Sequence, residues 1–280
     1  MWEQRMINTD RGEFEVFVAG SGEPLCVTHL YSEFNKRGNY FADMLVDSFT
    51  VFLINLKEAG NSPRVKNEGE LSMSEASEDL EAIRIALGFE LWSFAGHSTG
   101  GMLGLVYAAK HFNSLKRLMV GGATASKDYM EHKDSIYSYK NPLNERVKEL
   151  LSILKASDST KEQRMQAGRQ WTEMSLYKPS LFDEYFSKQS SGKVVQKRLD
   201  FYINYELPSY DIRDHITHIN TPTTVFCGKY DSQCPFVYSE EIHNLLPNSK
   251  LYVFETSNHF PQLEEKERFR EMVSDFRHSY

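Results

Sequence analysis

The chain has 280 residues, of which 40% are hydrophobic and 25% are charged, a balance typical of soluble globular proteins. Its net charge is −7 and it contains no long basic run, which argues against nucleic acid or an anionic membrane surface as a partner. No apolar stretch approaches the ~20 residues of a membrane span, and the first ten residues lack the apolar core of a signal peptide, so we expect a cytoplasmic protein.

The three cysteines, Cys26, Cys227 and Cys234, are odd in number and show no CxxC spacing. This pattern predicts reduced thiols without a disulfide or a metal site.

Short apolar runs, rich in β-branched and aromatic residues, alternate with helical patterns along most of the chain. The runs that predict strands are residues 14–19, 24–30, 50–56, 91–97, 115–122, 223–229 and 250–256. Several of them are continuously apolar, as expected of strands covered by helices on both faces.

The helical patterns lie between these runs. Residues 72–88 open with Ser72 and Glu75 at capping-box spacing and end at Gly88, with one apolar face between them. Further apolar stripes follow residue 98 and recur over residues 269–276. The alternation predicts an α/β fold with a mostly parallel sheet wrapped by helices.

Residues 126–214 interrupt this alternation, because they contain helical stretches and no convincing strand. We interpret them as a helical cap inserted between two core strands. The predicted organisation is therefore a core in two parts, residues 1–125 and 215–280, with the cap at 126–214.

The sequence Gly96-His97-Ser98-Thr99-Gly100 fits the pattern G-x-S-x-G, with a strand-like run before it and a helix-like run after it. A serine between two glycines at such a junction is typical of a nucleophile on a sharp strand-to-helix turn. Such a hydroxyl needs a base to take its proton and a carboxylate to orient that base.

The chain supplies an acid and a histidine after Ser98, in that order. Asp231 follows the predicted strand at 223–229, and His259 lies in the loop after the strand at 250–256. Asp128, the competing acid, comes late after its strand and is the weaker candidate. His97 is next to Ser98, and we expect it to point away from the site.

Taken together, these motifs resemble the α/β-hydrolase fold family, in its capped serine hydrolase branch, almost from end to end. Residues 55–63 (NLKEAGNSP) are similar to the family's D-x-R-G-x-G-x-S loop, and residues 258–269 (NHFPQLEEKERF) are similar to its histidine loop. The resemblance implies Ser98 as nucleophile, Asp231 as acid and His259 as base, with no metal and no organic cofactor.

The family's oxyanion loop usually reads H-G-x-x-G, whereas this chain has His29-Leu30-Tyr31-Ser32-Glu33. The backbone N–H of Thr99 is one expected oxyanion donor. The second is that of Tyr31, by its position in the motif, or that of Leu30.

The first functional hypothesis is a carboxylesterase-like enzyme that cleaves a small, largely apolar ester through an acyl-enzyme. The second is an aminopeptidase of the proline iminopeptidase type, for which Trp171 and Glu173 would be substrate contacts. His29 is a further candidate substrate contact. The third is a ligand-binding member of the fold without turnover. The expected partner is a small acyl substrate, and the sequence leaves the oligomeric state open.

Overall fold

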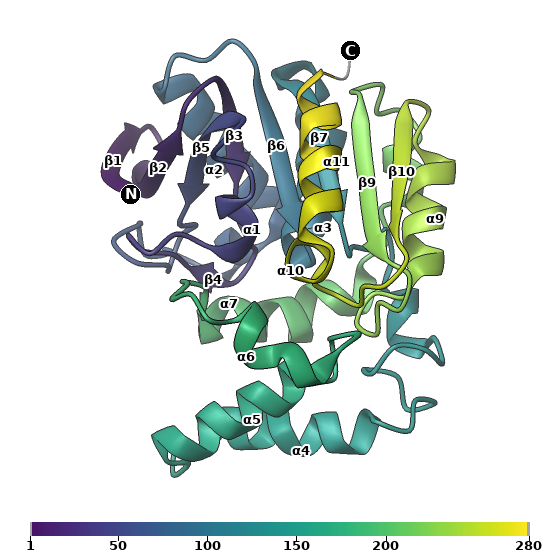
Figure 1. Ribbon diagram of the computed structural model, residues 1–280. Helices are drawn as coiled ribbons and strands as arrows, with labels where there is room; N and C mark the ends of the chain where they lie inside the picture. The colour runs from purple at the N-terminus through teal and green to yellow at the C-terminus, as the bar shows by residue number, and fades with distance from the viewer. Residues whose placement is uncertain (1, 279–280) are drawn as a thin grey trace.

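An eight-stranded sheet forms the centre of the molecule, and the computed structural model describes residues 2–278 (Figure 1). Across the sheet the strands follow the order β1-β2-β5-β3-β6-β7-β9-β10. Their bounds are β1 Glu3–Thr9, β2 Gly12–Gly20, β3 Glu23–Val27, β5 Phe49–Ile54, β6 Trp92–His97, β7 Leu115–Gly121, β9 Thr223–Gly228 and β10 Ser249–Phe254.

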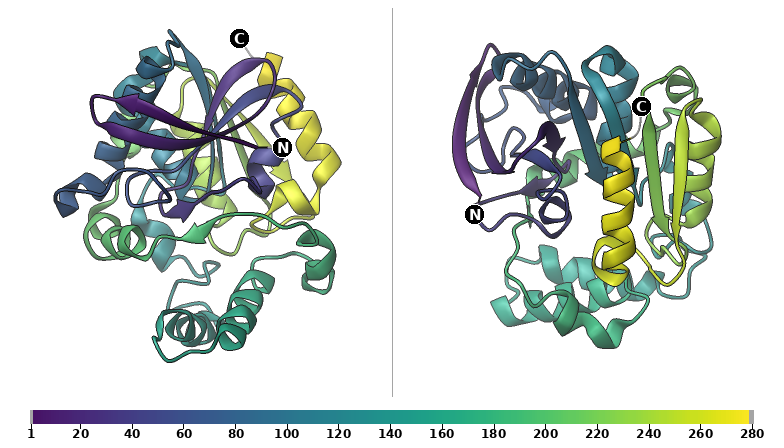
Figure 2. Two further views of the ribbon diagram at one scale, coloured as in Figure 1. Left: turned by 90° about the vertical axis from the view of Figure 1, so that its left-hand side faces the viewer. Right: turned by 45° about the horizontal axis from the view of Figure 1, so that its top comes forward.

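The sheet is mostly parallel, which confirms the predicted fold class. β3, β5, β6, β7, β9 and β10 pair in parallel, whereas β2 pairs antiparallel with both β1 and β5. Strand β1 was not predicted from the sequence, because EQRMINT is polar and most of its side chains are exposed. It is the edge strand of the β1–β2 hairpin (Figure 2, left), where a strand can face water.

Helices cover both faces of the sheet. On one face lie α2 Met73–Ala86, α3 Thr99–His111 and α9 Phe236–Leu245, whose apolar side chains join one buried cluster. On the other lie α1 Tyr40–Asp43 and α11 Lys266–His278, whose apolar side chains join a second. Two cores separated by a sheet are the expected result of strands that are apolar on both sides.

The two best-patterned helices form as predicted. The Ser72 hydroxyl accepts a hydrogen bond from the Glu75 N–H at 3.1 Å and so caps α2. In α11 the buried side chains are Phe269, Met272, Val273 and Phe276, at helical spacing. Burying each of them stabilises the fold by roughly 1.5–3 kcal/mol relative to exposure.

The helices of residues 126–214, here called the inserted segment, lie below the sheet in Figure 1. Those labelled there are α4 Asn144–Lys155, α5 Lys161–Glu173, α6 Phe182–Tyr185 and α7 Gln196–Phe201. A π-helical turn, Tyr202–Glu206, follows α7, and α8 Arg213–Ile216 crosses the end of the segment. A two-residue strand, β8 Lys193–Val194, pairs antiparallel with β4 Ser32–Glu33 of the core. The division of the chain into core and cap at residues 126 and 214 stays a prediction.

The carboxyl ends of the parallel strands all meet at one edge of the sheet, as they must in a parallel arrangement. The loops after β3, β6, β9 and β10 carry the predicted site residues. This is the edge at which open α/β sheets bind ligands. Between residues 2 and 278 the structure holds no helix that combines the length and the apolar character needed to cross a bilayer.

Candidate active site

Ser98 occupies the sharp turn between β6 and α3. Its backbone is left-handed, with φ 58° and ψ −131°, a conformation that costs a non-glycine residue roughly 1–3 kcal/mol. The flanking glycines are required by space: a Cβ at Gly96 would lie 2.2 Å from the Gly100 carbonyl oxygen, and one at Gly100 would lie 2.5 Å from that of Thr28. The turn therefore has the tight, strained geometry that the motif predicts.

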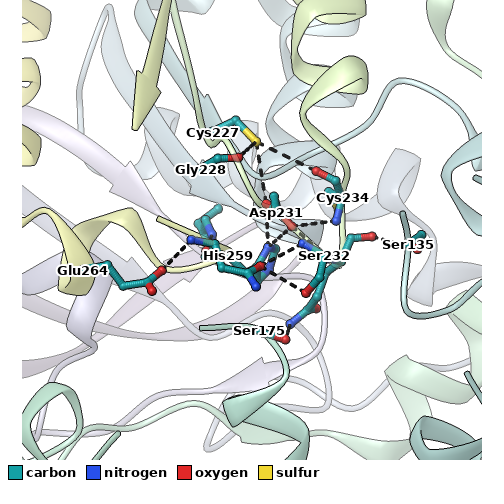
Figure 3. A network of polar contacts seen from close by, with 12 residues as sticks. Ser135, Ser175, Cys227, Gly228, Asp231, Ser232, Cys234, His259 and Glu264 are labelled. Carbon is teal, nitrogen blue, oxygen red and sulfur yellow. Dashed lines mark hydrogen bonds and ion pairs between the residues drawn. The ribbon is translucent and has the colours of Figure 1, made fainter. Parts of the chain in front are cut away.

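Asp231 and His259 are brought together although 28 residues separate them (Figure 3). His259 Nδ1 lies 3.0 Å from Asp231 Oδ1 and 2.9 Å from Oδ2, and both side chains are buried. The N–H groups of Gln233 and Cys234 donate to Oδ1 at 2.9 and 2.8 Å, which fixes the carboxylate. A histidine held through Nδ1 leaves its Nε2 free to exchange a proton with another group.

The backbone of His259 is held from two sides. Its N–H donates to the carbonyl of Ser175, just after α5 of the inserted segment, at 3.1 Å. Its carbonyl accepts a hydrogen bond from Nε2–H of His97 at 2.7 Å. Burial, and then the proximity of His259, hold the pKa of His97 well below its ordinary value, so His97 is neutral.

The expectation that His97 points away from the site was wrong. Its ring lies 4.5 Å, centre to centre, from that of His259 and stacks on Phe226 at 6.1 Å. Asp128, the competing acid, forms an ion pair at 2.9 Å with Arg213 instead.

Gly121 and Gly122, at the end of β7, connect Ser98 to the Asp231–His259 pair. The Ser98 N–H donates to the Gly121 carbonyl at 2.8 Å. Gly122 has φ 51°, and a Cβ there would lie 3.2 Å from both Asp231 Oδ2 and His259 Cε1. The turn that carries Ser98 and the Asp231–His259 pair therefore lie on either side of the same short stretch of backbone, Gly121–Gly122.

The expected oxyanion loop lies after β3, next to the start of α3. His29 braces it, because its Nε2 is hydrogen-bonded to Thr99 Oγ1 at 3.0 Å and its Nδ1 to Ser32 Oγ at 2.9 Å. Burial, followed by the neighbouring His259 and Arg198, lowers the pKa of His29 to about 3, so the ring is neutral. With both ring nitrogens hydrogen-bonded within the protein, His29 supports the loop, and its role as a substrate contact stays a prediction.

The Thr99 N–H lies in the first turn of α3, where an amide has no partner within the helix. The loop braced by His29 lies beside Thr99, and the role of the Thr99 N–H as an oxyanion donor stays a prediction. Tyr31 and Leu30, the alternative second donors, form the turn of this loop.

The two residues of the inserted segment that are predicted as substrate contacts differ in their surroundings. Glu173 accepts a hydrogen bond from Arg169 Nε at 2.8 Å, and the same arginine also pairs with Asp183, so the charge of Glu173 is compensated. Trp171 is partly buried, and its buried Nε1 has no hydrogen-bond partner.

Sequence reasoning missed a chain of four tyrosines that runs from the expected oxyanion loop to the loop that carries Asp231. Tyr31 packs against Tyr202 at 6.1 Å, whose hydroxyl lies 3.2 Å from that of Tyr129. Tyr129 in turn packs against Tyr137, which donates to Gln233 Oε1 at 2.8 Å. Burial raises the pKa of Tyr31 to about 12, so it is a neutral phenol. Three of these residues belong to the inserted segment, and only their aromatic character was visible in the sequence.

A surface groove of about 880 Å³ lies away from this site, between the β1–β2 turn and the residues that precede α2. Four of its charged side chains form two ion pairs, Arg11 with Glu75 at 2.5 Å and Lys57 with Glu70 at 3.0 Å. It contains neither Ser98 nor the Asp231–His259 pair.

A parallel sheet with a left-handed serine on a strand-to-helix turn, beside a buried aspartate–histidine pair at the carboxyl edge, is the arrangement of an α/β hydrolase. Residues 29–266 match the family model described as alpha/beta hydrolase fold. The chain belongs to the α/β-hydrolase fold family.

Individual relatives are hydrolases as well. An α/β fold family hydrolase from Bacillus anthracis str. Sterne is 46% identical, with a TM-score of 0.97 over 99% of each chain. Proline iminopeptidase of Saccharolobus solfataricus is 25% identical over 237 residues, which are 78% of this chain and 72% of that one. The esterase EaEST of Exiguobacterium antarcticum shares the fold, with a TM-score of 0.71 at 23% identity over 99% of this chain and 100% of its own.

Proposed function

We propose that the protein is a metal-independent serine hydrolase that cleaves a small ester, with Ser98 as nucleophile, His259 as base and Asp231 as the acid that orients it. The observation that carries the proposal is the left-handed backbone of Ser98. A non-glycine residue keeps such a conformation only where its surroundings enforce it, and strain of this kind is found mainly at functional sites.

In the proposed reaction, Ser98 Oγ attacks the ester carbonyl while His259 Nε2 takes its proton. Asp231 holds the imidazole through Nδ1 and stabilises the positive charge that forms on the ring. The N–H groups of Thr99 and Tyr31, with Leu30 as the alternative to Tyr31, stabilise the oxyanion. His259 then protonates the leaving alcohol, and water releases the acyl group from Ser98 by the same steps in reverse.

We assign substrate choice to the inserted segment, acting as a cap over the carboxyl edge of the sheet. The tyrosine chain places aromatic rings between the loop after β3 and the loop of Asp231, and this aromatic character favours a small acyl group that is largely apolar. The three buried cysteines are free, which fits a reducing compartment and supports our expectation of a cytoplasmic enzyme.

An aminopeptidase of the proline iminopeptidase type is the second candidate, supported by the curated relatives with that name. Such an enzyme needs a carboxylate in the cap to hold a substrate's free amine. Glu173 is paired with Arg169 and is a poor choice. Glu206 is the better one, because its buried Oε2 has no partner, whereas its Oε1 accepts from the Met73 N–H.

The two candidates are separated by comparing p-nitrophenyl acetate and butyrate with prolyl and alanyl p-nitroanilides, using the wild type and Ser98→Ala. We expect ester hydrolysis that falls at least about 10⁴-fold in Ser98→Ala, and little anilide cleavage. Preferential cleavage of the anilides, with a raised KM in Glu206→Gln but not in Glu173→Gln, would establish the aminopeptidase instead. Wild-type rates equal to those of Ser98→Ala on every substrate would contradict both.

A further inference from the structure

Arg198 is a buried arginine of the inserted segment, and its guanidinium donates hydrogen bonds to backbone carbonyls of the core. It lies on α7 and is only 2% exposed. Its Nε donates to the carbonyl of Leu30, Nη1 to that of Lys57 at 3.2 Å and Nη2 to that of Leu71 at 3.1 Å. Burying a cation is costly unless it is well hydrogen-bonded, so this arrangement calls for an explanation.

The contact with Leu30 falls on the peptide group of the oxyanion loop. In a planar trans peptide the C=O of one residue and the N–H of the next point in opposite directions. The C=O of Leu30 therefore shares one rigid unit with the N–H of Tyr31. A guanidinium that holds this C=O on one side of the loop sets the direction of that N–H on the other.

We propose that Arg198 is a positioning residue that orients the Tyr31 N–H toward the oxyanion formed at Ser98, an inference that rests on the proposed function. The contacts with Lys57 and Leu71 tie the guanidinium to two core loops, so that it is a fixed anchor for Leu30. The next peptide is also held by the inserted segment, because the Val195 N–H donates to the Tyr31 carbonyl at 2.8 Å.

The loop sequence explains why an anchor is needed. The second position of the family's H-G-x-x-G loop is a glycine, and this chain has Leu30 there. The course of the loop is therefore not set by the motif's glycine. Arg198 adds an electrostatic effect, because a cation at the C=O end polarises the peptide and strengthens its N–H as a donor. Burial lowers the pKa of Arg198 to about 10, while Asp79, Glu206 and Glu58 oppose this effect, so the group stays charged at neutral pH.

The test is the rate at which Ser98 is labelled by a fluorophosphonate, a reaction that develops oxyanion charge and requires no knowledge of the substrate. In Arg198→Met we expect the second-order labelling rate to fall about 100-fold, close to the loss of one oxyanion donor. The kcat for p-nitrophenyl acetate should fall by a similar factor while KM changes less than about 3-fold. For Arg198→Ala, added guanidinium should restore labelling about 10-fold, whereas added sodium chloride should not.

Arg84→Met is the matched control. Arg84 also donates to two backbone carbonyls, those of Phe89 and Glu90, and pairs with Glu81, but it lies at the far end of α2. Its loss should affect stability and leave the labelling rate unchanged. A folded Arg198→Met that is labelled at the wild-type rate, or that changes only KM, would overturn the inference.

If Arg198→Met does not fold, Arg198→Lys retains the cation and one donor, and about a 10-fold loss is expected. A further measurement uses the wild-type protein alone. When Ser98 is phosphonylated, the NMR signal of the Tyr31 amide proton should move downfield. An unchanged signal would contradict the proposal. Absence of labelling at Ser98 in the wild type would instead contradict the proposed function itself.

Discussion

The two sides of the candidate site are held by the inserted segment in different ways. On the histidine side the contacts come from backbone groups of residues 174–177. The carbonyl of Ser175 accepts from the His259 N–H, and the carbonyl of Met174 accepts from Ser232 Oγ at 2.9 Å. The N–H of Tyr177 donates to Glu264 Oε1 at 2.6 Å. On the oxyanion side one backbone group, the Val195 N–H, donates to the Tyr31 carbonyl, and one side chain, Arg198, makes three contacts with core carbonyls.

This difference predicts different responses to mutation. Contacts made by several backbone groups survive most single substitutions, because every residue supplies an N–H and a C=O. A contact made by one buried guanidinium depends on that one residue. The histidine side should therefore tolerate changes in its supporting residues, whereas the oxyanion side should not.

The largest effect on kcat should come from removing the carboxylate that holds His259. Asp231→Asn removes the carboxylate that fixes the tautomer of His259, and we expect kcat to fall roughly 10³–10⁴-fold with little change in KM. Steady-state kinetics with p-nitrophenyl acetate measure this, and Asp128→Asn, which alters an acid paired with Arg213, should keep wild-type rates. A loss smaller than 10-fold would argue that Asp231 does not serve His259.

A smaller effect is expected from Gly122→Ala. Both Gly122 and Gly88 are left-handed, with φ 51° and 74°, so an alanine at either position should cost roughly 1–2 kcal/mol of stability. Only the Cβ at position 122 would meet Asp231 and His259; at position 88 nothing lies within 4 Å.

We therefore expect kcat to fall about 10-fold in Gly122→Ala and to stay unchanged in Gly88→Ala, at similar losses in melting temperature. Equal kinetics in the two variants would show that the backbone at the end of β7 does not set the geometry of the acid–histidine pair.

The smallest kinetic effect should follow from Glu264→Gln. Glu264 accepts hydrogen bonds from the N–H groups of Asn258 and Tyr177 and so links the histidine loop to the inserted segment. Because this is one contact among several, we expect kcat to stay within about 3-fold of the wild type at pH 8, in contrast to the loss in Arg198→Met.

The same variant should change how stability depends on pH. Burial raises the pKa of Glu264 from 4.5 to about 7, although the backbone donors oppose this. Between these values the folded protein binds a proton that the unfolded chain has released, so this group's contribution to stability falls as pH rises through the window.

Glutamine does not titrate, so the wild type should lose melting temperature relative to Glu264→Gln between pH 5 and pH 8. A constant difference between the two proteins over this range, or one of opposite sign, would exclude the raised pKa.

Local signals made the fold predictable and pointed to three candidate site residues. Ser98, Asp231 and His259 each follow an apolar run, and the carboxyl ends of parallel strands share one edge of the sheet, so chain order alone indicates that they meet. The structure does bring Asp231 and His259 into hydrogen-bond contact.

The supporting residues could not be predicted, because their partners are distant in sequence. Leu30 and Arg198 are 168 residues apart, and no periodicity connects them. His97 was expected to point away from the site. No local signal in the sequence reveals that the loop after β10 brings the carbonyl of His259 within hydrogen-bond distance of its ring.

Glu58 departs from the family motif, and the sequence alone does not show which backbone conformation it adopts. It occupies the first glycine position of the D-x-R-G-x-G-x-S loop and keeps a left-handed backbone at φ 71°. Its carboxylate accepts from the Val65 N–H at 2.9 Å and from Lys197 at 3.0 Å, contacts that a glycine could not make. Side-chain contacts stabilise here a backbone that glycine adopts freely.

The unpartnered Nε1 of Trp171 gives the protein an optical reporter. The other two indoles donate hydrogen bonds within the core, Trp2 to Asp43 at 2.8 Å and Trp92 to Tyr107 at 2.9 Å. Trp171 belongs to α5 of the inserted segment, and its ring nitrogen is shielded but unbound. Water reaching that nitrogen would shift the emission of Trp171 to longer wavelength, whereas the emission of the other two tryptophans should stay unchanged.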